Sequence, residues 1–297
     1  MRAFQLFWLM LLAALTVSCA SPLALAPGDQ AATANATALT LRVLSYNIRC
    51  GSCESADDVN HWSQRKFRVA KLIHEAQVDL VGLQEAEKFQ VDDLVELLRD
   101  FDWVGVGRDD GQTKGEMNAV LVRRSVFAIE SQQTLWLSET PQQMSRGWDA
   151  MFKRTLTLLR LKERQRGREL YFLNTHFDHH GAQARSQSAQ LIAQTVRKLP
   201  NRLPVLLTGD LNERPGSASY QTLNNSLRDA ERVSLQAPTG GDISFNGFGK
   251  DIERGNKIDF VFVSSDVGVR SHQLITALQD GYYPSDHYAV RVEASLD

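Results

Sequence analysis

The sequence predicts an α/β domain in which mixed β-sheets pack together and helices lie on the outside. From Leu41 onward, short apolar runs typical of strands alternate with longer segments whose apolar residues recur at helical spacing. The predicted strands outnumber the predicted helices by more than two to one, and several neighbouring strands are close enough to be joined by tight turns. A barrel of βα units needs a helix after each strand, so the excess of strands favours packed sheets.

The predicted strands are runs rich in Val, Leu, Ile, Phe and Tyr. In chain order they are Leu41–Ile48, Val78–Gln84, Trp103–Gly107, Asn118–Arg123, Phe127–Leu137, Thr155–Leu161, Glu169–Asn174, Pro204–Thr208, Ile258–Val263 and Tyr288–Ala294. The predicted helices are His61–Gln77, Val91–Arg99 and Ala182–Leu199, each with one apolar stripe. No internal repeat or second linker interrupts the series, so residues 41–297 are predicted to form one domain.

The first 19 residues resemble an export signal. Arg2 is followed by LFWLMLLAALTV (residues 6–17), which is too short to span a bilayer but suits a signal-peptide core. The run ends at Thr16-Val17-Ser18-Cys19, which resembles a bacterial lipoprotein signal except that Thr16 stands where Leu is preferred. We therefore expect an exported protein of the cell envelope, lipid-anchored in the periplasm through Cys19. Ordinary secretion after cleavage and an uncleaved anchor are the alternatives.

Residues 20–40 are expected to form a flexible tether between the signal and the domain. This stretch contains eight alanines, two prolines and a single charge, Asp29, and it has no apolar periodicity.

The charge balance bears on the class of partner. The chain of 297 residues carries 33 Lys+Arg and 35 Asp+Glu, a net charge of −2, which becomes −3 when residues 1–19 are removed with Arg2. Proteins that grip nucleic acid without specificity usually carry a basic excess. We therefore expect no obligate nucleic-acid partner, although Lys153–Arg154 and the segment 160–168 could form a local basic patch. A monomer is the simplest expectation.

Cys50 and Cys53 are the cysteines that remain after Cys19, separated by Gly51-Ser52. In an exported protein this pair could close a small loop disulfide. A thioredoxin-like centre would require the pair to open a helix, and a zinc site would require further ligands nearby. The loop-like sequence that follows favours the disulfide.

Polar side chains stand at the ends of the predicted strands. They are Asn47, Glu85, His176, Asp178, Asp210, Asn212, Asp259, Asp286 and His287. If the last two strands run antiparallel to the others, these groups meet at one edge of the sheets, where such scaffolds present functional groups. Carboxylate and amide oxygens suit Mg²⁺ or Mn²⁺, and histidines beside them suit proton transfer or stabilisation of negative charge.

Six sequence blocks then point to a family. LSYNIR (44–49), VGLQEAE (81–87), NTHFDHHG (174–181), TGDLNERPGS (208–217), NKIDFVFVSS (256–265) and YPSDHYAV (283–290) resemble, in order, those of the endonuclease/exonuclease/phosphatase superfamily. The resemblance covers nearly the whole domain. It implies the DNase I-like four-layer α/β sandwich, with two packed mixed β-sheets flanked by helices. It also implies a metal-dependent hydrolase of phosphate esters.

The resemblance assigns a metal group and a phosphate group of residues. Glu85 is similar to the principal metal-binding carboxylate of the family, Asn47 contacts the metal or its water, and Asp286 reaches the same region. Asn212 resembles a donor to the phosphate. The implied ion is Mg²⁺ or Mn²⁺.

The resemblance also assigns the groups that act on the reacting atoms. Asp210 is similar to the carboxylate that orients or deprotonates water. His287 is similar to a histidine that is paired with Asp259, and His176 resembles a donor to a phosphoryl oxygen or the leaving group. Glu116 is a candidate to support His176, on position alone.

Other interpretations of single residues stay open. Asn47 and Asn212 are also typical turn residues, and Asp259 could be an isolated acid at a strand edge. His179 and His180 invite a zinc hypothesis, but no third ligand is evident, and Asp178 with His179 is expected to support the loop of His176. Large aromatic residues near the site, Trp136, Trp148, Phe245 and Phe248, could line a pocket but more often pack in the core or loops. Arg108–Gly111 is expected to be a solvated turn.

The sequence thus predicts an exported, metal-dependent phosphoesterase in which water attacks phosphorus in line, with the ester unidentified. The alternatives are a secreted nuclease of the same superfamily and a phosphate-binding or metal-binding lipoprotein without turnover.

Overall fold

The computed structural model describes residues 38–56, 58–250, 252 and 256–296. Their strands are β1 (Leu39–Asn47), β2 (Leu80–Gln84), β3 (Phe101–Val104), β4 (Val120–Arg123), β5 (Phe127–Trp136), β6 (Thr155–Glu163), β7 (Glu169–His176), β8 (Val205–Asp210), β9 (Arg228–Asp229), β10 (Asp259–Val263), β11 (Val267–Ile275) and β12 (Ala289–Leu296). The α-helices are α2 (Trp62–Glu75), α3 (Lys88–Leu97), α4 (Ala182–Lys198) and α5 (Ala218–Ser226). Short 3₁₀ turns are η1 (Gly51–Cys53), η2 (Pro200–Arg202) and η3 (Gly247–Gly249).

The described strands form two six-stranded sheets. The strand order is β11-β12-β1-β2-β4-β3 in the first sheet and β5-β6-β7-β8-β10-β9 in the second. Apolar residues of both sheets, such as Val43, Leu80, Phe172 and Val261, share one buried core between them. The two sheets therefore pack face to face, as the sequence predicts.

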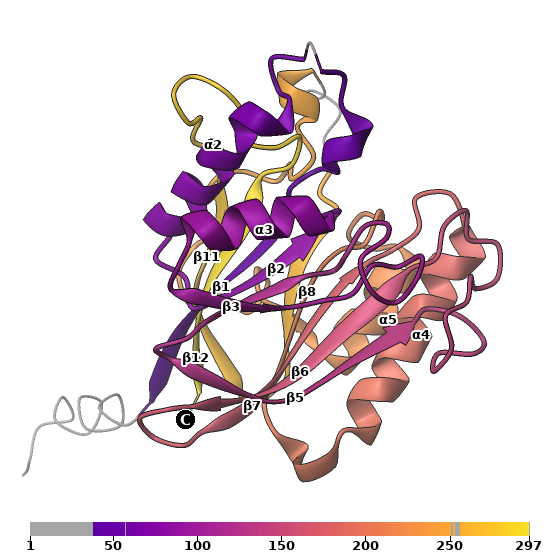
Figure 1. Ribbon diagram of the computed structural model, residues 1–297. Helices are drawn as coiled ribbons and strands as arrows, with labels where there is room; N and C mark the ends of the chain where they lie inside the picture. Colours follow the sequence, from indigo (N-terminus) through magenta and orange to yellow (C-terminus); the bar gives the residue numbers. More distant parts are fainter. Residues whose placement is uncertain (1–37, 57, 251, 253–255, 297) are drawn as a thin grey trace, which may run out of the picture. The chain divides into compact units, whose positions relative to one another are not determined.

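The helices cover the outer faces of the sheets. Buried residues of α2 and α3, including Ile73 and Leu94, pack against the first sheet, and Ile192 of α4 and Leu223 of α5 pack against the second. The helices of each pair lie on the same side of the domain in Figure 1. Helix, sheet, sheet and helix thus make the four layers of the predicted DNase I-like α/β sandwich.

Strand direction brings the polar strand ends to one edge. β1 and β2 are parallel, as are β7 and β8, so the C-terminal ends of each pair lie together. β10 runs antiparallel to β8, and β12 runs antiparallel to β1, so these two strands present their N-terminal ends at the same edge. The orientation on which the predicted convergence depends is therefore confirmed.

A buried polar seam joins the two sheets beneath this edge. Asn174 on β7 donates from Nδ2 to the Leu83 carbonyl oxygen at 2.7 Å, and its Oδ1 accepts from Gln84 Nε2 at 2.7 Å. Gly82 makes this approach possible, because a Cβ there would lie 2.0 Å from Oγ1 of Thr208 and 2.7 Å from Oδ1 of Asn174. Both amide atoms of Asn174 are paired, although Oε1 of Gln84 is buried without a hydrogen-bond partner, and paired buried groups of this kind favour one arrangement of the packed layers. These bonds fix how β2 and β8 are offset along their length, and therefore where their C-terminal residues lie relative to each other.

Some elements differ from those predicted. Helix α5 and strands β9 and β11 were not predicted; β11 carries a register shift between Val269 and Ser271 that breaks its alternation of buried and exposed residues. β1 begins at Leu39, two residues before the predicted start of the domain. The predicted signal peptide and the rest of the tether, up to residue 37, lie outside the described residues. No helix in the described part of the chain is long and apolar enough to cross a membrane.

Candidate active site

The strand ends surround a cleft of about 460 Å³. Its lining residues include Glu85, His176, Asp210, Asn212, Asp286 and His287 from the predicted set. Asn47 and Asp259 are completely buried behind them. The structure therefore brings together all eight predicted site residues, although they are separated by up to 240 positions in the sequence.

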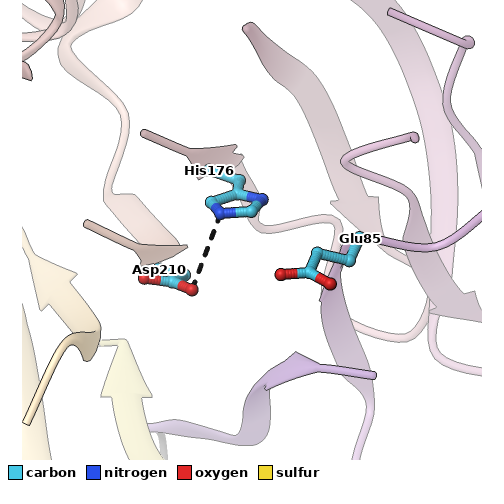
Figure 2. A group of neighbouring side chains, drawn as sticks. All are labelled: Glu85, His176 and Asp210. Atoms are coloured by element: carbon cyan, nitrogen blue, oxygen red, sulfur yellow. Dashed lines mark ion pairs between the residues drawn. The ribbon is translucent and has the colours of Figure 1, made fainter. Parts of the chain in front are cut away.

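Asn47 links the two carboxylates that face the cleft. Its Nδ2 donates to Oε1 of Glu85 at 3.0 Å and to Oδ2 of Asp210 at 3.0 Å, and its Oδ1 accepts from the Arg49 backbone N–H at 2.9 Å. Figure 2 shows Glu85 and Asp210 pointing toward each other from opposite sides, with His176 between them. One amide therefore sets the separation between two acids contributed by different sheets.

Asp210 is the hub of the site. Its Oδ2 lies 3.7 Å from Nε2 of His176 and 3.9 Å from Nε2 of His287, and its Oδ1 accepts from the Asn212 backbone N–H at 2.8 Å. Burial, reinforced by the nearby charge of Asp259, raises the pKa of Asp210 to about 7. A carboxyl group whose pKa lies near neutrality can take up and release a proton at physiological pH.

His287 is held as a cation by the acid behind it. Burial by itself would lower the pKa of His287, but the Asp259 carboxylate, whose Oδ2 lies 2.8 Å from Nδ1, raises it to about 10, with help from Asp210 and Asp286. The Asp259 partner leaves Nε2 of His287 facing the cleft side of Asp210. Such a fixed positive charge suits the stabilisation of an anion.

His176 has a different environment from His287. Burial lowers its pKa, and the positive charge of Arg154 adds to the effect. Nη1 of Arg154 lies 2.9 Å from Nδ1 of His176, and Nδ2 of Asn212 lies 3.0 Å from Nε2. The two histidines thus flank the Asp210 carboxylate in different charge states: His176 is a neutral imidazole and His287 is an imidazolium.

Glu116 and Arg108 extend the support of His176. Oε2 of Glu116 lies 3.8 Å from Nδ1 of His176 and 2.6 Å from Nη1 of Arg108. The prediction of a solvated turn is therefore wrong for Arg108, which is 8% exposed and lies against the Phe152 ring at 4.6 Å. A long aliphatic stem and a planar cation allow arginine to pack in this way, which sequence patterns do not reveal.

Asp178 holds the loop that follows β7, as predicted. It accepts from the backbone N–H groups of Met151, Phe152, His180 and Gly181 at 2.9–3.1 Å. These bonds, together with Arg154, lower the pKa of Asp178 although burial opposes them. His179 lines the cleft, and neither it nor His180 belongs to a three-ligand group among the described residues.

Asp286 lies in the cleft but pairs with a cation. Its Oδ2 accepts from Nη1 of Arg49 at 2.6 Å, and Asp286 is absent from the groups of close ligand atoms found in the described residues. Arg49 was not singled out by sequence reasoning, although it ends the first sequence block two positions after Asn47. It adds a positive charge to the lining of the cleft.

Three site residues adopt left-handed backbone conformations. The φ angles are 60° at Glu85, 49° at Asn212 and 58° at Arg49. Side chains with a Cβ rarely adopt this region, and such residues gather at functional sites where the surrounding fold enforces them. Here the sharp turn directly after β1, β2 or β8 directs the side chain into the cleft instead of along the strand.

The donor set fits a hard divalent ion. Ligand atoms of Glu85, His176 and Asp210 lie within 4.8 Å of one another, as do those of Asp210, Asp259 and His287. The first group combines the half-buried carboxylate of Glu85 and the buried carboxylate of Asp210 with the imidazole of His176, and it contains no thiolate. Oxygen donors of this kind favour Mg²⁺ or Mn²⁺ over softer ions.

The cleft walls contain one predicted aromatic residue and the disulfide. Phe245 lines the cleft, with its ring edge-on to His287 at 5.1 Å, whereas Trp136, Trp148 and Phe248 are not among the lining residues. Phe152, which was not predicted, lines the opposite wall near Arg154. Cys50 and Cys53 form the predicted disulfide and also face the cleft.

A family model agrees with this geometry. The model of the endonuclease/exonuclease/phosphatase family matches residues 44–287, which is most of the chain. The chain belongs to this family. Its members are phosphoester hydrolases, and the fold described above is that of a hydrolase that acts on phosphate esters.

Solved structures give the same result. The chain is 34% identical to an endonuclease/exonuclease/phosphatase from Bacteroides vulgatus, with a TM-score of 0.83, covering 87% of this chain and 100% of that one. It is also 34% identical to a mannosyl-6-phosphatase from Bacteroides thetaiotaomicron VPI-5482, with a TM-score of 0.79, covering 86% and 99%.

A curated relative is more distant. Nocturnin of Drosophila melanogaster is 23% identical over 202 residues, which is 62% of this chain and 30% of that protein. The chain therefore spans under a third of the length of this relative. The match supports the family assignment but says little about the substrate.

Proposed function

We propose that this chain is a divalent-metal-dependent phosphatase that removes phosphate from a small phosphate ester, with a phosphorylated sugar as the first candidate. The observation that carries the proposal is the position of Asp210 between His176, His287 and Asn47 at the base of a cleft. The volume of this cleft, about 460 Å³, is in the range of pockets for small ligands. The likeness to a mannosyl-6-phosphatase at 34% identity supports a sugar phosphate.

The residues present suggest how an ion and a phosphate would be held. Glu85 would hold Mg²⁺ or Mn²⁺, with Asp286 available once it is released from Arg49, and Asn47 would position the Glu85 carboxylate by donating to it from Nδ2. When bound, the ion supplies positive charge that offsets the charge of the phosphate and of the departing oxygen. Asn212, whose Nδ2 lies at the cleft between His176 and the Phe177 carbonyl, would donate to a phosphate oxygen.

The remaining residues would act on water and on the developing charge. Asp210, with a pKa of about 7, accepts the proton of the attacking water. The His287 imidazolium, fixed by Asp259, stabilises the negative charge that builds on the phosphoryl oxygens. His176, held by Arg154 and Asn212, is placed to interact with the leaving oxygen. Positioning and charge stabilisation of this kind account for most of phosphoryl-transfer catalysis.

We further propose that the protein is exported and anchored through Cys19, as a monomer. The signal-like segment supports export, and the Cys50–Cys53 disulfide is typical of proteins from oxidising compartments. Labelling with a fatty-acid analogue tests the anchor, and a Cys19→Ser variant that still takes up label would contradict it.

A substrate panel tests the function. Hexose 6-phosphates, inositol phosphates, p-nitrophenyl phosphate, bis(p-nitrophenyl) phosphate, phospholipids and oligonucleotides are assayed with Mg²⁺, with Mn²⁺ and with EDTA. We expect metal-dependent release of phosphate from small monoesters, lost in Glu85→Ala and His287→Ala. His180→Ala serves as the matched control, because its exposed ring lies next to the site but does not line the cleft. Preference for oligonucleotides would favour a nuclease, and no EDTA-sensitive turnover would favour a binding protein.

A further inference from the structure

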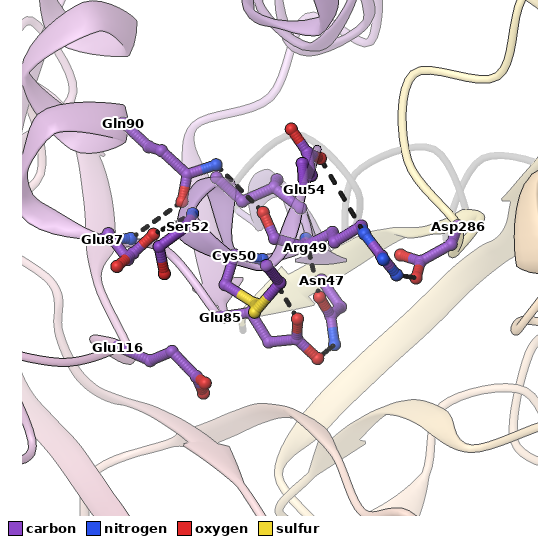
Figure 3. Close-up of a disulfide and its surroundings, with 12 residues drawn as sticks. Asn47, Arg49, Cys50, Ser52, Glu54, Glu85, Glu87, Gln90, Glu116 and Asp286 are labelled. Carbon is purple, nitrogen blue, oxygen red and sulfur yellow. Dashed lines mark hydrogen bonds and ion pairs between the residues drawn. A yellow bond between two sulfur atoms is a disulfide. The ribbon is translucent and has the colours of Figure 1, made fainter. Parts of the chain in front are cut away.

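The loop after β1 makes direct contact with the Glu85 carboxylate. The backbone N–H of Cys50 donates to Oε2 of Glu85 at 3.1 Å, while Asn47 donates to Oε1 (Figure 3). Each oxygen of the carboxylate therefore has its own donor, one from a side chain and one from the backbone. The orientation of Glu85 depends on where the Cys50 peptide lies.

The peptide that joins Arg49 to Cys50 is held on its carbonyl side, where the Arg49 oxygen accepts from Gln90 Nε2 at 2.9 Å and from Arg65 Nη2 at 3.4 Å. On its Cys50 side the turn that follows is closed less tightly. The turn η1 closes with backbone bonds of 3.3 Å from the Cys53 N–H to the Cys50 carbonyl and 3.4 Å from the Glu54 N–H to the Gly51 carbonyl. Both exceed the usual length of 2.7–3.2 Å for such bonds. The disulfide between Cys50 and Cys53, with Cα atoms 5.4 Å apart, is the strong link across this turn.

The two ends of the turn are tied to different partners. Gln90 Nε2 donates to the Arg49 carbonyl at 2.9 Å, and the Ser52 N–H donates to Oε2 of Glu87 at 2.7 Å. Figure 3 shows this row of contacts running from α3 along the loop to Glu85 and Asp286. These bonds hold the Arg49 carbonyl and the Ser52 N–H, so the disulfide adds a restraint on the Cα of Cys50, which lies between them.

We propose that the Cys50–Cys53 disulfide is a positioning element for the Glu85 carboxylate, so that breaking it weakens divalent-ion binding without unfolding the domain. The inference rests on the proposed function, because it assigns Glu85 to the ion. Cys53 is exposed and both cysteines line the cleft, so a reductant can reach the bond. Reduction by a phosphine and water yields two thiols and the phosphine oxide, and releases the Cα of Cys50 from Cys53, so that the Cys50 N–H can tilt away from Glu85.

The test is a Mn²⁺ titration followed by electron paramagnetic resonance on the metal-free full chain. The oxidised protein is compared with protein reduced by a phosphine and then desalted without oxygen, and with the Cys50→Ser/Cys53→Ser variant. We expect the dissociation constant to rise about tenfold in both, or about 1.4 kcal/mol, because the hydrogen bond from the Cys50 N–H to the charged carboxylate is weakened but not lost. Hydrogen exchange of the Cys50 amide should quicken in parallel.

Two controls separate positioning from general stability. Phosphine treatment of the double variant should leave its dissociation constant unchanged. In Glu85→Ala, which lacks the carboxylate, oxidised and reduced proteins should bind Mn²⁺ equally weakly.

Equal dissociation constants for oxidised and reduced wild-type chain would overturn the inference alone, even if the melting temperature fell. No Mn²⁺ binding by the oxidised protein would overturn both the inference and the metal-dependent function. If the double variant does not fold, the reduced wild-type chain with its exchange measurement still decides the question.

Discussion

Replacing Asp178 should destabilise the domain and the site together. Its carboxylate accepts four backbone N–H bonds at 2.9–3.1 Å and faces Nε of Arg154 at 3.4 Å, while being 1% exposed. Asp178→Ala would leave the four N–H groups without their acceptor and would take from the buried Arg154 one of its acidic partners, leaving Glu116 at 3.6 Å. Loss of one partner from a buried pair costs about 3–5 kcal/mol, so we expect a loss of about 4 kcal/mol in the free energy of unfolding.

Asp178→Asn is the graded comparison. An amide oxygen in the place of Oδ1 keeps the bonds from Met151, His180 and Gly181, while the amide nitrogen would face the donors of Phe152 and Arg154. We therefore expect about half the cost of the alanine variant, about 2 kcal/mol.

Urea unfolding followed by tryptophan fluorescence measures both losses, and phosphate release by the folded protein measures the effect on His176 through Arg154. We expect kcat to fall about tenfold in Asp178→Asn at unchanged metal affinity. A loss below about 1 kcal/mol in Asp178→Ala, or equal losses in the two variants, would refute the reasoning that these bonds are what holds the loop.

Two further predictions concern buried histidines. Asp259→Asn should lower the pKa of His287 from about 10 and reduce kcat about a hundredfold with little change in melting temperature; full activity would contradict the role given to the imidazolium. His272 lies buried in β11, where burial lowers its pKa to about 3, so the folded state holds it neutral. Its contribution to stability is complete above the unfolded pKa of about 6.5 and is lost as the pH falls toward 3, by about 1.4 kcal/mol per pH unit. His272→Leu should therefore flatten the fall in unfolding free energy between pH 6 and pH 4, whereas the exposed His74→Gln should follow the wild-type curve.

The apolar periodicity was enough to predict the layered fold. β2, β7 and β8 are almost wholly buried and β1 is buried from Val43 onward, so each carries a cluster of apolar residues that stands out from the polar segments between them. α5 was missed because its segment ASYQTLNNS buries only Ser219, Tyr220 and Leu223, too few apolar residues for a clear stripe, although Ser217 caps its first turn.

The site residues that lie at strand ends or within the family's sequence blocks could be predicted from the sequence. Asn47, His176 and Asp210 are the last residues of buried strands and Glu85 directly follows one, and the parallel pairing brings these ends to one edge. Arg154 and Arg108 were not identified as site residues, because nothing in their spacing tells a buried arginine from a surface one; only the tertiary contacts with Glu116 and Phe152 do so.

The pairing of Asp286 with Arg49 could not be predicted either. The sequence shows that Asp286 stands beside His287. Whether Asp286 pairs with the guanidinium of Arg49 or with a metal ion depends on the turn of the chain at Arg49, where φ is 58°. The polar seam beneath the site could not be predicted for a similar reason. Nothing in the sequence around Gly82 indicates that Asn174 and Thr208 lie against it in the fold.

The most direct test of the account is the metal-dependent release of phosphate from a hexose 6-phosphate by wild type, Asp210→Asn and His180→Ala. We predict turnover with Mg²⁺ or Mn²⁺ that EDTA abolishes, a loss of at least about a hundredfold in Asp210→Asn, and wild-type rates in His180→Ala. Undiminished turnover in Asp210→Asn, or turnover that persists in EDTA, would contradict the assignment of this cluster as a metal-dependent hydrolytic site.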